Sequence, residues 1–517
     1  MKTIEHSEVI IIGAGAAGLL LAARLAESGK QVSILEAGPK RSLQDLTSSQ
    51  IWARRLKWSG PEVLETGNHP IGHAFNAGSG TGGSALHHYG VWLRMHENDF
   101  SVKTDYNKSL DWPLSYDDLR PHYDIVQEEV GLSGDAKAEK WRPPGSPYPM
   151  PPIPVFQQGQ IIKKGFDKRK MDLSPIPLAI NTLVHNGRPS CMYDGWCDAG
   201  CPSGALGNPL AVWLPRTIKS GVSILHDSRA IRILRDPNNS DRATAVEYLK
   251  NGKKHLLHSN LIIVAAFSVQ SSRILLSSFT DKDPAPGNRQ DQLGRYLTTH
   301  PAGSVYGLFE EETYPYQGVN AGVLLNQDFY KEKDYQGAFG SSQWLIANAL
   351  KPNDLLGYGT GRPDIYGREL KPWLERAAKH LGSMTLVAED ISLAKNQVTL
   401  SDRTDSDGVP LAHTHHDVTE ESRQLWSQRM SEGQEILRDA GAYDTWQGPM
   451  AAVHIMGGTV MGTSDKNSVT DKTGRVHDME NLYVCGPSLF PSSGAVNPTF
   501  TLSALASLQA DNLISHQ

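Results

Sequence analysis

The first forty residues alternate between apolar runs and a helical pattern. The segment Glu8-Val-Ile-Ile-Ile12 is β-branched, as a parallel strand buried on both faces requires. Leucines and alanines then recur at helical spacing from Leu19 to Ser28, and a second apolar run covers Gln31–Leu35. The order strand, helix, strand predicts an α/β fold built around a parallel sheet.

The turn between the first strand and the helix is rich in glycine, with the sequence Gly13-Ala-Gly15-Ala-Ala-Gly18. In a dinucleotide-binding fold the first glycine permits the turn, the second lets the backbone approach a pyrophosphate, and the third allows close helix–strand packing. The second strand ends at Glu36, where a carboxylate can accept hydrogen bonds from an adenosine ribose. These features together predict a dinucleotide site, which the motif alone does not assign to FAD or NAD.

Composition narrows the class of protein. The 517 residues exceed what one hydrophobic core usually serves, so two or three structural units are expected. A net charge of -6 with interspersed signs lacks the basic patch of a nucleic-acid-binding protein, which favours a small-molecule partner. The uncharged segment Val9–Ala23 is too short to span a membrane and follows acidic residues, so neither a membrane span nor a signal peptide is expected.

Further motifs follow in a fixed order along the chain. After Glu36-Ala-Gly38 comes a Gly-rich loop at 77–84, and the middle of the chain carries a buried-strand pattern at 261–266 and the segment Gly294-Arg-Tyr-Leu-Thr-Thr-His300-Pro301. The C-terminus carries His454-Ile-Met-Gly-Gly, Asn481–Gly486 and Phe490–Thr499. This set of motifs resembles the glucose-methanol-choline (GMC) family of FAD oxidoreductases.

The resemblance implies a domain organisation. A Rossmann-like FAD-binding domain, discontinuous in sequence, would consist of residues 1–100, 200–305 and 450–517. Residues 101–199 and 306–449 would form an α+β substrate-binding domain with an antiparallel sheet, together with connecting segments. Ser115 is expected to cap a helix, with Asp118 in its first turn.

The resemblance also implies which residues bind FAD. They come from the first glycine motif, the end of the second strand, the Gly-rich loop, the middle motifs and the C-terminal block. They are Gly13, Gly15, Ala16, Ala17, Gly18, Glu36, Ala37, Gly78, Gly82, Gly83, Ser84, His87, Ala230, Ala266, Gly486, Asn497, Pro498 and Thr499. His87 stands four residues after Gly83, the spacing of a histidine that some branches of the family bond covalently to the flavin. Other relatives with this spacing bind FAD without a bond, so covalent attachment stays open.

Two residues of the C-terminal block are candidates for catalysis. His454 corresponds to the active-site histidine of the family and Asn497 to the second position of the pair. Histidine suits proton abstraction near neutral pH, and an asparagine amide can hold a substrate oxygen. We therefore expect oxidation of a hydroxyl group of a sugar, glycoside, polyol or other alcohol to a carbonyl by hydride transfer to flavin N5. The alternatives are an oxidase that uses O2, a non-catalytic flavoprotein subunit and, with less support, a carbon–carbon lyase.

Three of the four cysteines lie close together as Cys191-x5-Cys197-x3-Cys201. The spacing is too wide for a zinc site, and a fourth ligand is missing. A similar run holds a three-iron cluster in membrane-linked sugar dehydrogenases of the family, whereas other branches have a related turn without metal. We favour free or disulfide-bonded thiols over the cluster.

The electron acceptor and the location are linked to the cysteine question. With a cluster, a small or cytochrome subunit would accept electrons; without one, oxygen, a quinone or a dye could do so. The chain is expected in the cytoplasm, or in the periplasm if it is exported with a partner subunit. His415 and His416 lack a motif context and are expected on the surface or in a loop.

Overall fold

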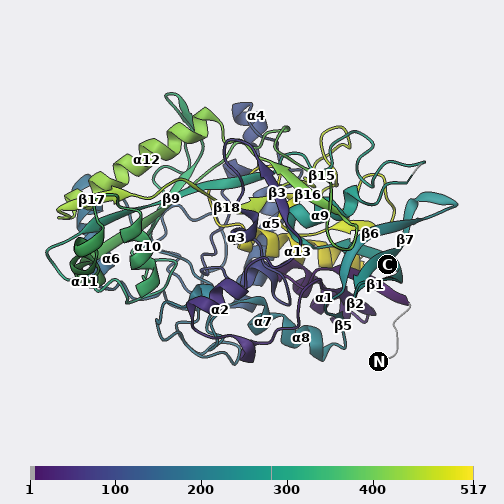
Figure 1. Ribbon diagram of the computed structural model, residues 1–517, viewed down its shortest axis with the longest axis horizontal. Coiled ribbons are helices and arrows are strands. Elements are labelled where there is room, and N and C mark those ends of the chain that lie inside the picture. The colour runs from purple at the N-terminus through teal and green to yellow at the C-terminus, as the bar shows by residue number, and fades with distance from the viewer. Residues whose placement is uncertain (1–5, 281, 516–517) are drawn as a thin grey trace.

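A computed structural model describes residues 6–280 and 282–515 of the chain. Two seven-stranded sheets dominate it. Figure 1 shows them toward opposite ends of the longest axis, with β1 and β2 in one and β9 and β17 in the other. This mixed architecture confirms the predicted α/β class with an additional antiparallel sheet.

The first sheet has the strand order β5-β2-β1-β8-β7-β6, and β19 also pairs with β8. Strand β1 (His6–Ile12) lies parallel to β2 (Val32–Leu35) on one side and to β8 (Lys253–Val264) on the other. Their register brings Ile12, Leu35 and Val264 to the same edge. The remaining strands are β5 (Ser223–Leu225), β6 (Arg229–Asp236), β7 (Asn239–Lys250) and β19 (Leu482–Val484).

Helices cover the first sheet and connect its strands. Helix α1 (Ala16–Glu27) follows β1, and α13 (Thr499–Ser515) packs against both α1 and α5 (Tyr116–Val130). Ser115 Oγ accepts a hydrogen bond from the Asp118 amide, and the Asp118 carboxylate accepts one from the Ser115 amide, which confirms the predicted cap of α5. Further helices in the first 280 residues are α2 (Gln50–Arg55), α3 (His73–Asn76), α4 (Val102–Tyr106), α7 (Pro209–Val212), α8 (Leu214–Lys219) and α9 (Phe267–Leu276).

The second sheet is antiparallel, with the order β17-β9-β14-β13-β10-β4 and with β18 also paired to β9. Its central strands are β9 (Thr298–Leu308) and β14 (Leu381–Ala388). Helix α12 (Glu420–Asp439) packs on β9 and β14 and against α6 (Gln157–Arg169). The other strands are β4 (Ser174–Pro175), β10 (Leu324–Asn326), β13 (Ser342–Ile346), β17 (Asp444–Gln447) and β18 (Ala451–Met456). Most of this sheet comes from the region in which the sequence offered no motif.

Smaller elements complete the fold. A three-stranded sheet has the order β15-β16-β3, in which β3 (Val63–Thr66) pairs with β16 (Pro410–His415). This pairing joins two segments that the sequence assigned to different domains, and sheet membership alone does not fix a boundary, so the domain limits stay a prediction. The remaining elements are β11 (Asp334–Tyr335), β12 (Ala338–Phe339), β15 (Gln397–Thr404), α10 (Pro352–Thr360) and α11 (Leu370–His380).

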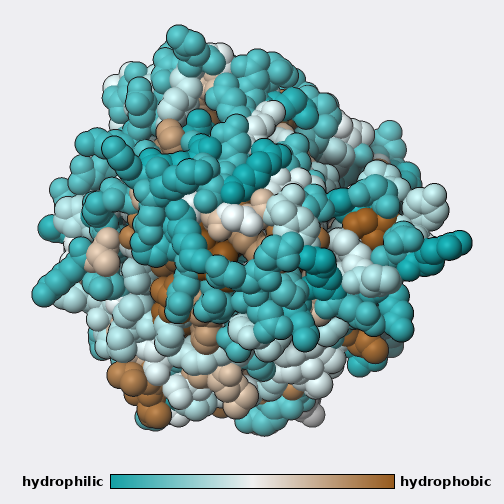
Figure 2. Space-filling model, turned by 90° about the vertical axis from the view of Figure 1, so that its left-hand side faces the viewer, coloured by the Kyte–Doolittle hydropathy of each residue, from teal (hydrophilic) through white to brown (hydrophobic). Residues whose placement is uncertain are grey.

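The surface is largely hydrophilic. Figure 2 shows teal side chains over most of the face at the antiparallel-sheet end, with apolar residues in a few areas. Among residues 6–280 and 282–515, no helix combines the length and the apolar character needed to cross a membrane.

Candidate active site

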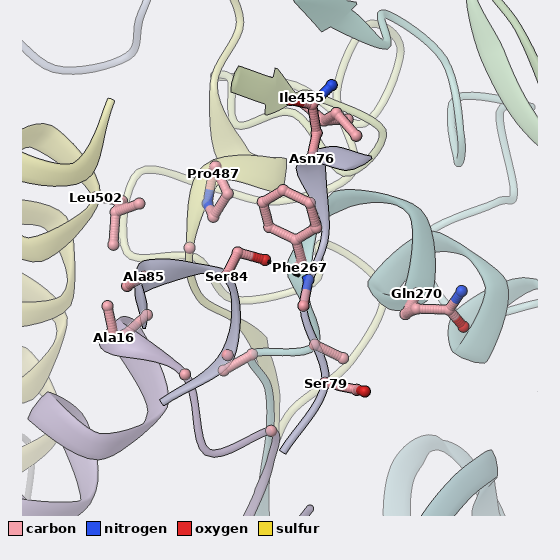
Figure 3. Close-up of a pocket in the computed structure, with 18 of the residues that line it drawn as sticks. Ala16, Asn76, Ser79, Ser84, Ala85, Phe267, Gln270, Ile455, Pro487 and Leu502 are labelled. Carbon is pink, nitrogen blue, oxygen red and sulfur yellow. Dashed lines mark hydrogen bonds between the residues drawn. The ribbon is translucent and has the colours of Figure 1, made fainter. Parts of the chain in front are cut away.

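A cavity of about 310 Å³ opens where the parallel strands end. Its walls include residues just past the C-terminal ends of four strands, namely Gly13 after β1, Glu36 after β2, Ala265 after β8 and Cys485 after β19. In open α/β sheets this edge is where ligands bind. Figure 3 shows side chains from separate elements around the cavity, among them Ala16 of α1, Ser84 of the Gly-rich loop, Phe267 of α9, Ile455 of β18 and Leu502 of α13.

The glycine motif brings the backbone of α1 close to both the sheet and the cavity. Gly13 has φ +109°, and a Cβ there would lie 2.5 Å from the Ala265 carbonyl oxygen. A Cβ on Gly18 would lie 2.0 Å from the Gly13 carbonyl oxygen, so only glycine lets α1 pack this closely. A Cβ on Gly15 would meet no atom within 4 Å, because this residue faces the open cavity. The first turn of α1 has no side-chain cap, which leaves its positive dipole end directed at the cavity.

Glu36 ties the glycine turn to the Gly-rich loop. One carboxylate oxygen accepts hydrogen bonds from the amides of Gly38 (2.8 Å) and Gly80 (2.9 Å), and the other accepts one from Ala14 (2.8 Å). The side chain is buried and lines the cavity. Glu36 therefore has a structural role, and its second oxygen keeps an acceptor position that the ribose contact predicted from the sequence would need.

The structure gathers most of the sequence-predicted cofactor residues around one space. Those that line the cavity are Gly13, Gly15, Ala16, Ala17, Glu36, Ala37, Gly78, Gly83, Ser84, His87, Ala230, Ala266, Gly486, Asn497, Pro498 and Thr499. Gly18 and Gly82 lie behind the lining, Gly18 against Gly13 and Gly82 with its amide bonded to the Ala14 carbonyl at 2.8 Å. Both therefore support the cavity wall.

His454 also lines the cavity, at an irregularity in β18. The register of β18 with β9 shifts between Val453 and Met456, and His454 there has φ +58°. A non-glycine residue in the left-handed region costs of order 1–3 kcal/mol and is common at functional sites. The bulge turns the imidazole toward Asn497 and His300.

The hydrogen bonds around His454 fix the positions of its protons. His300 Nε2 lies 3.3 Å from the Ser493 carbonyl oxygen, an acceptor only, so His300 carries its proton on Nε2. His300 Nδ1 then accepts from His454 Nδ1 at 2.9 Å. Consequently His454 Nε2 is unprotonated, and it accepts from Asn497 Nδ2 at 3.2 Å.

The same chain orients Asn497. Its Oδ1 accepts from Gln343 Nε2 at 3.2 Å, and Gln343 Oε1 accepts from Gln327 Nε2 at 2.9 Å. If the Asn497 amide were flipped, its oxygen would face the lone pair of His454 Nε2. Its NH2 group would then face the NH2 group of Gln343. The network thus holds the amide N–H groups of Asn497 on the His454 side.

Burial keeps the two histidines neutral. It lowers the pKa of His300 to about 4, and burial together with the neighbouring His300 lowers the pKa of His454 well below its ordinary value. A neutral imidazole with a lone pair on Nε2 is a proton acceptor. His454 therefore has the protonation state of a general base across the neutral range.

A buried ion pair lies behind His300. His416 Nδ1 donates to the His69 carbonyl oxygen (2.7 Å), and Nε2 lies 2.9 Å from Asp390 Oδ2. Burial opposes protonation, but Asp390 raises the pKa of His416 above its ordinary value. His416 lies in the loop after β16, one of the two predicted positions, but it is buried and not at the surface, because a charge partner on a distant segment makes burial tolerable; His415, at the end of β16, is partly exposed.

His87 lies beside a half-buried lysine. Its Nδ1 is 3.1 Å from Lys57 Nζ, while Nε2 is buried without a protein partner. Burial and then Lys57 lower the pKa of His87 to about 3, and burial lowers the pKa of Lys57 to about 8. Both residues line the cavity. Sequence analysis missed Lys57, which belongs to no motif.

The three clustered cysteines lie outside the lining of this cavity. All are free thiols, and across residues 6–280 and 282–515 no group of three His, Cys, Asp or Glu side chains is arranged to hold a metal ion. Cys191 Sγ accepts from the Tyr193 amide (3.3 Å), and Cys201 Sγ accepts from the Leu206 amide (3.4 Å). Cys485, which sequence analysis set aside, is the buried cysteine that lines the cavity.

Comparisons with known proteins agree with this site. Family models described as GMC oxidoreductase match residues 7–302 and 392–506. The fructose dehydrogenase large subunit of Gluconobacter japonicus is 26% identical over 98% of both chains. The 2-methyl-1,2-propanediol dehydrogenase of Mycolicibacterium austroafricanum is 26% identical over 99% of this chain and 96% of that one. Pyridoxine 4-oxidase from Mesorbium loti has a similar fold, with a TM-score of 0.67, 17% identity and coverage of 99% and 100%.

The two family models together span most of the chain. The motifs that line the cavity lie near both ends of the chain, within the matched residues. Relatives that align over nearly the whole length are dehydrogenases and oxidases of sugars and alcohols. The chain therefore belongs to the GMC oxidoreductases, FAD-dependent enzymes that oxidise a hydroxyl group to a carbonyl.

Proposed function

We propose that His454 is the base and Asn497 the positioning group of this alcohol oxidation. The observation that carries the proposal is the unprotonated Nε2 of His454 beside the Asn497 amide at the edge of the cavity. A substrate hydroxyl that replaces this hydrogen bond would donate its hydrogen to Nε2 and accept one from the Asn497 amide. This geometry would hold the carbinol C–H in a fixed orientation.

The proton would remain on His454 while the C–H bond breaks. An imidazolium there would carry hydrogens on both nitrogens, with Nδ1 still donating to His300 Nδ1. Because His300 is neutral and donates to Ser493, it would stabilise that cation through its lone pair. Bound FAD supplies the hydride acceptor.

The residues around the cavity suit FAD. The open position of Gly15 and the uncapped first turn of α1 fit a pyrophosphate, and Glu36 keeps an acceptor for a ribose hydroxyl. The buried Nε2 of His87 lacks a protein partner at another part of the lining. These features support a role in FAD binding for the eighteen residues predicted from the sequence. Gly18 and Gly82 would act by packing behind the cavity lining.

Anaerobic titration tests the proposed activity. The purified yellow protein should bleach with sugars, polyols or other alcohols in the absence of oxygen, and a carbonyl product should appear in equal amount. A flavin that no alcohol reduces would support the alternative of a non-catalytic flavoprotein. Aldehyde release without bleaching would support a lyase.

We infer further that FAD is bound without a covalent bond. A protonated Lys57 can only donate, so His87 Nδ1 accepts and its Nε2 carries the hydrogen. An Nε2–H imidazole is a poor nucleophile toward a flavin methyl group. Acid precipitation of the protein should therefore leave the flavin in the supernatant, whereas yellow precipitated protein would show a covalent bond at His87.

The cysteines are proposed to be thiols and not ligands of an iron–sulfur cluster. Burial raises the pKa of Cys191 to about 11 and also raises that of Cys197, which disfavours thiolates, and Cys191 and Cys201 make local hydrogen bonds. Iron analysis of the flavin-titrated sample decides between the two. Stoichiometric iron, close to three per flavin, would restore the cluster held by Cys191, Cys197 and Cys201.

The electron acceptor is proposed to be a quinone, with oxygen as the alternative and a partner subunit as the acceptor if iron analysis restores the cluster. The support is that matched relatives include a dehydrogenase large subunit and a gluconate 2-dehydrogenase flavoprotein. The bleached enzyme should then regain its colour faster with a quinone or dye than with oxygen. Such a role is compatible with the cytoplasm, or with the periplasm if a partner subunit carries the chain there.

A further inference from the structure

The face of the antiparallel sheet that carries His300 continues beyond the catalytic pair. Because side chains alternate along a strand, His300, Ala302, Ser304 and Tyr306 of β9 share one face. The other face is directed at α12, since a Cβ on Gly303 would meet Trp426 of that helix at 2.9 Å. Ser304 and Tyr306 therefore lie on the active-site side of the sheet.

Solvent reaches this face at a pair of hydroxyl groups. Ser304 is the only partly exposed residue of β9, and Thr385 is the only partly exposed residue of β14; all other residues of the two strands are buried. The two residues are register partners, with their side-chain oxygens 2.9 Å apart. Within β9 and β14 this pair is therefore the point of solvent access, whereas the neighbouring strands β17 and β18 also carry partly exposed residues.

The hydrogen bonds around the pair have a defined direction. Asn348 Nδ2 donates to the Asn320 carbonyl (3.1 Å), which leaves Asn348 Oδ1 as the acceptor of Thr385 Oγ1 (3.1 Å). Thr385 therefore donates to Asn348 and accepts from the Ser304 hydroxyl. Tyr306 shares a side-chain hydrogen bond with Ser304, which leaves one lone pair of Ser304 Oγ at the exposed end, where it suits an incoming O–H donor.

Ser304 and Thr385 do not line the cavity, but Tyr306, on the same face, belongs to a group of tyrosines that includes Tyr89 of the cavity lining. The rings of Tyr306 and Tyr358 lie 4.3 Å apart. Burial, then Tyr306, Asp354 and Tyr89 raise the pKa of Tyr358 well above its ordinary value, and Tyr89 lines the cavity and is 45% exposed. Neutral tyrosines offer both a ring face and a hydroxyl donor, a combination that suits a polyhydroxylated ligand.

The sheet register gives the spacing between this pair and the residue that orients Asn497. Gln343, which bonds to Asn497, belongs to the row Gln343–Val387–Ala302. The row of Ser304 and Thr385 is two residues further along, about 6.5 Å at the rise of an extended strand. That separation matches a second hydroxyl several bonds away from the carbinol carbon.

We propose that Ser304 and Thr385 form a subsite that hydrogen-bonds a second, non-reacting hydroxyl of the substrate. The subsite makes the enzyme selective for polyhydroxylated substrates, sugars or polyols, over alcohols with a single hydroxyl. The inference rests on the proposed function and deepens it. Neither residue touches the reacting atoms; each acts on specificity alone.

The experiment compares two substrate classes in anaerobic flavin reduction. Hexoses and hexitols are the polyhydroxylated probes, and 1-hexanol is the matched single-hydroxyl probe. Ser304→Ala and Thr385→Val should each lower kcat/KM for the best polyhydroxylated probe about tenfold, the effect of one lost hydrogen bond, and change kcat/KM for 1-hexanol less than twofold. Thr385→Ser keeps the hydroxyl and should retain the wild-type preference.

The control is Thr445→Val on β17. Thr445 pairs with Gly307 and so lies on the opposite face of the same sheet, toward α12. The Thr445→Val variant should keep the wild-type kcat/KM for both substrate classes. If the variants lose kcat/KM equally on both substrate classes, or if neither variant loses any, the subsite is overturned. Bleaching of the wild-type flavin by an alcohol would still uphold the proposed function. If no alcohol bleaches the wild-type flavin, the proposed function fails and the subsite fails with it.

Discussion

Replacing His454 with alanine lowers the rate constant of flavin reduction by about 10²–10⁴, the usual contribution of a general base. The variant removes the only imidazole lone pair that faces Asn497 in the cavity of the described chain. FAD stays bound, because most of the residues expected to hold it lie outside β18, in the glycine motifs and in the segments that follow the parallel strands. Anaerobic stopped-flow bleaching measures the rate, and the visible spectrum measures bound flavin.

Two further variants separate loss of the base from loss of structure. His454→Gln can still donate to His300 but cannot take a proton, so it should be as slow as the alanine variant. His258→Ala, an exposed histidine of β8, should behave as wild type. A His454→Gln enzyme with more than a tenth of the wild-type rate would exclude His454 as the base.

Wild-type kcat/KM should keep its value as the pH falls to 6.5 and decline only below this pH, since burial lowers the pKa of His454.

Local chemistry explains what the sequence predicts well. The turn at Gly13–Gly18 needs its glycines whatever the rest of the chain does, since a Cβ at Gly18 would strike the Gly13 carbonyl. The cap of α5 likewise depends on residues three apart, Ser115 and Asp118. Features of this kind are encoded in short segments, so pattern and motif predict them.

Long-range pairing explains what the sequence does not predict. Gln343, which orients Asn497, lies in a region without a motif and reaches the site only because β13 pairs with β14 and β14 with β9. His416 stands next to Asp417 in the sequence, yet the carboxylate that bonds to its ring is that of Asp390 on another segment. Sheet register and buried ion pairs depend on partners that one stretch of sequence cannot reveal.

Lys333→Met lowers the free energy of unfolding by about 3–5 kcal/mol, the usual cost of breaking a buried ion pair. Lys333 Nζ bonds to Asp99 Oδ1 (2.7 Å), Glu389 Oε2 (2.6 Å) and Ser341 Oγ (2.7 Å), and all three charged side chains are 0% exposed. The variant leaves two carboxylates facing each other without a cation. Thermal or denaturant unfolding of the FAD-bound enzyme measures the loss.

Lys331→Met is the matched control, because this lysine is exposed two residues away and should leave stability within about 0.5 kcal/mol of wild type. Adding Asp99→Asn and Glu389→Gln to Lys333→Met should recover part of the loss of stability, since these changes remove the uncompensated charge.

Tyr330 links this triad to the active site. Its hydroxyl donates to Asp99 Oδ2 (2.8 Å) and accepts from the Ala495 amide (3.0 Å), two residues before Asn497. Lys333→Met should therefore also slow flavin reduction in the enzyme that remains folded. If both the rate and the stability are unchanged, the triad supports neither the fold nor the position of Asn497.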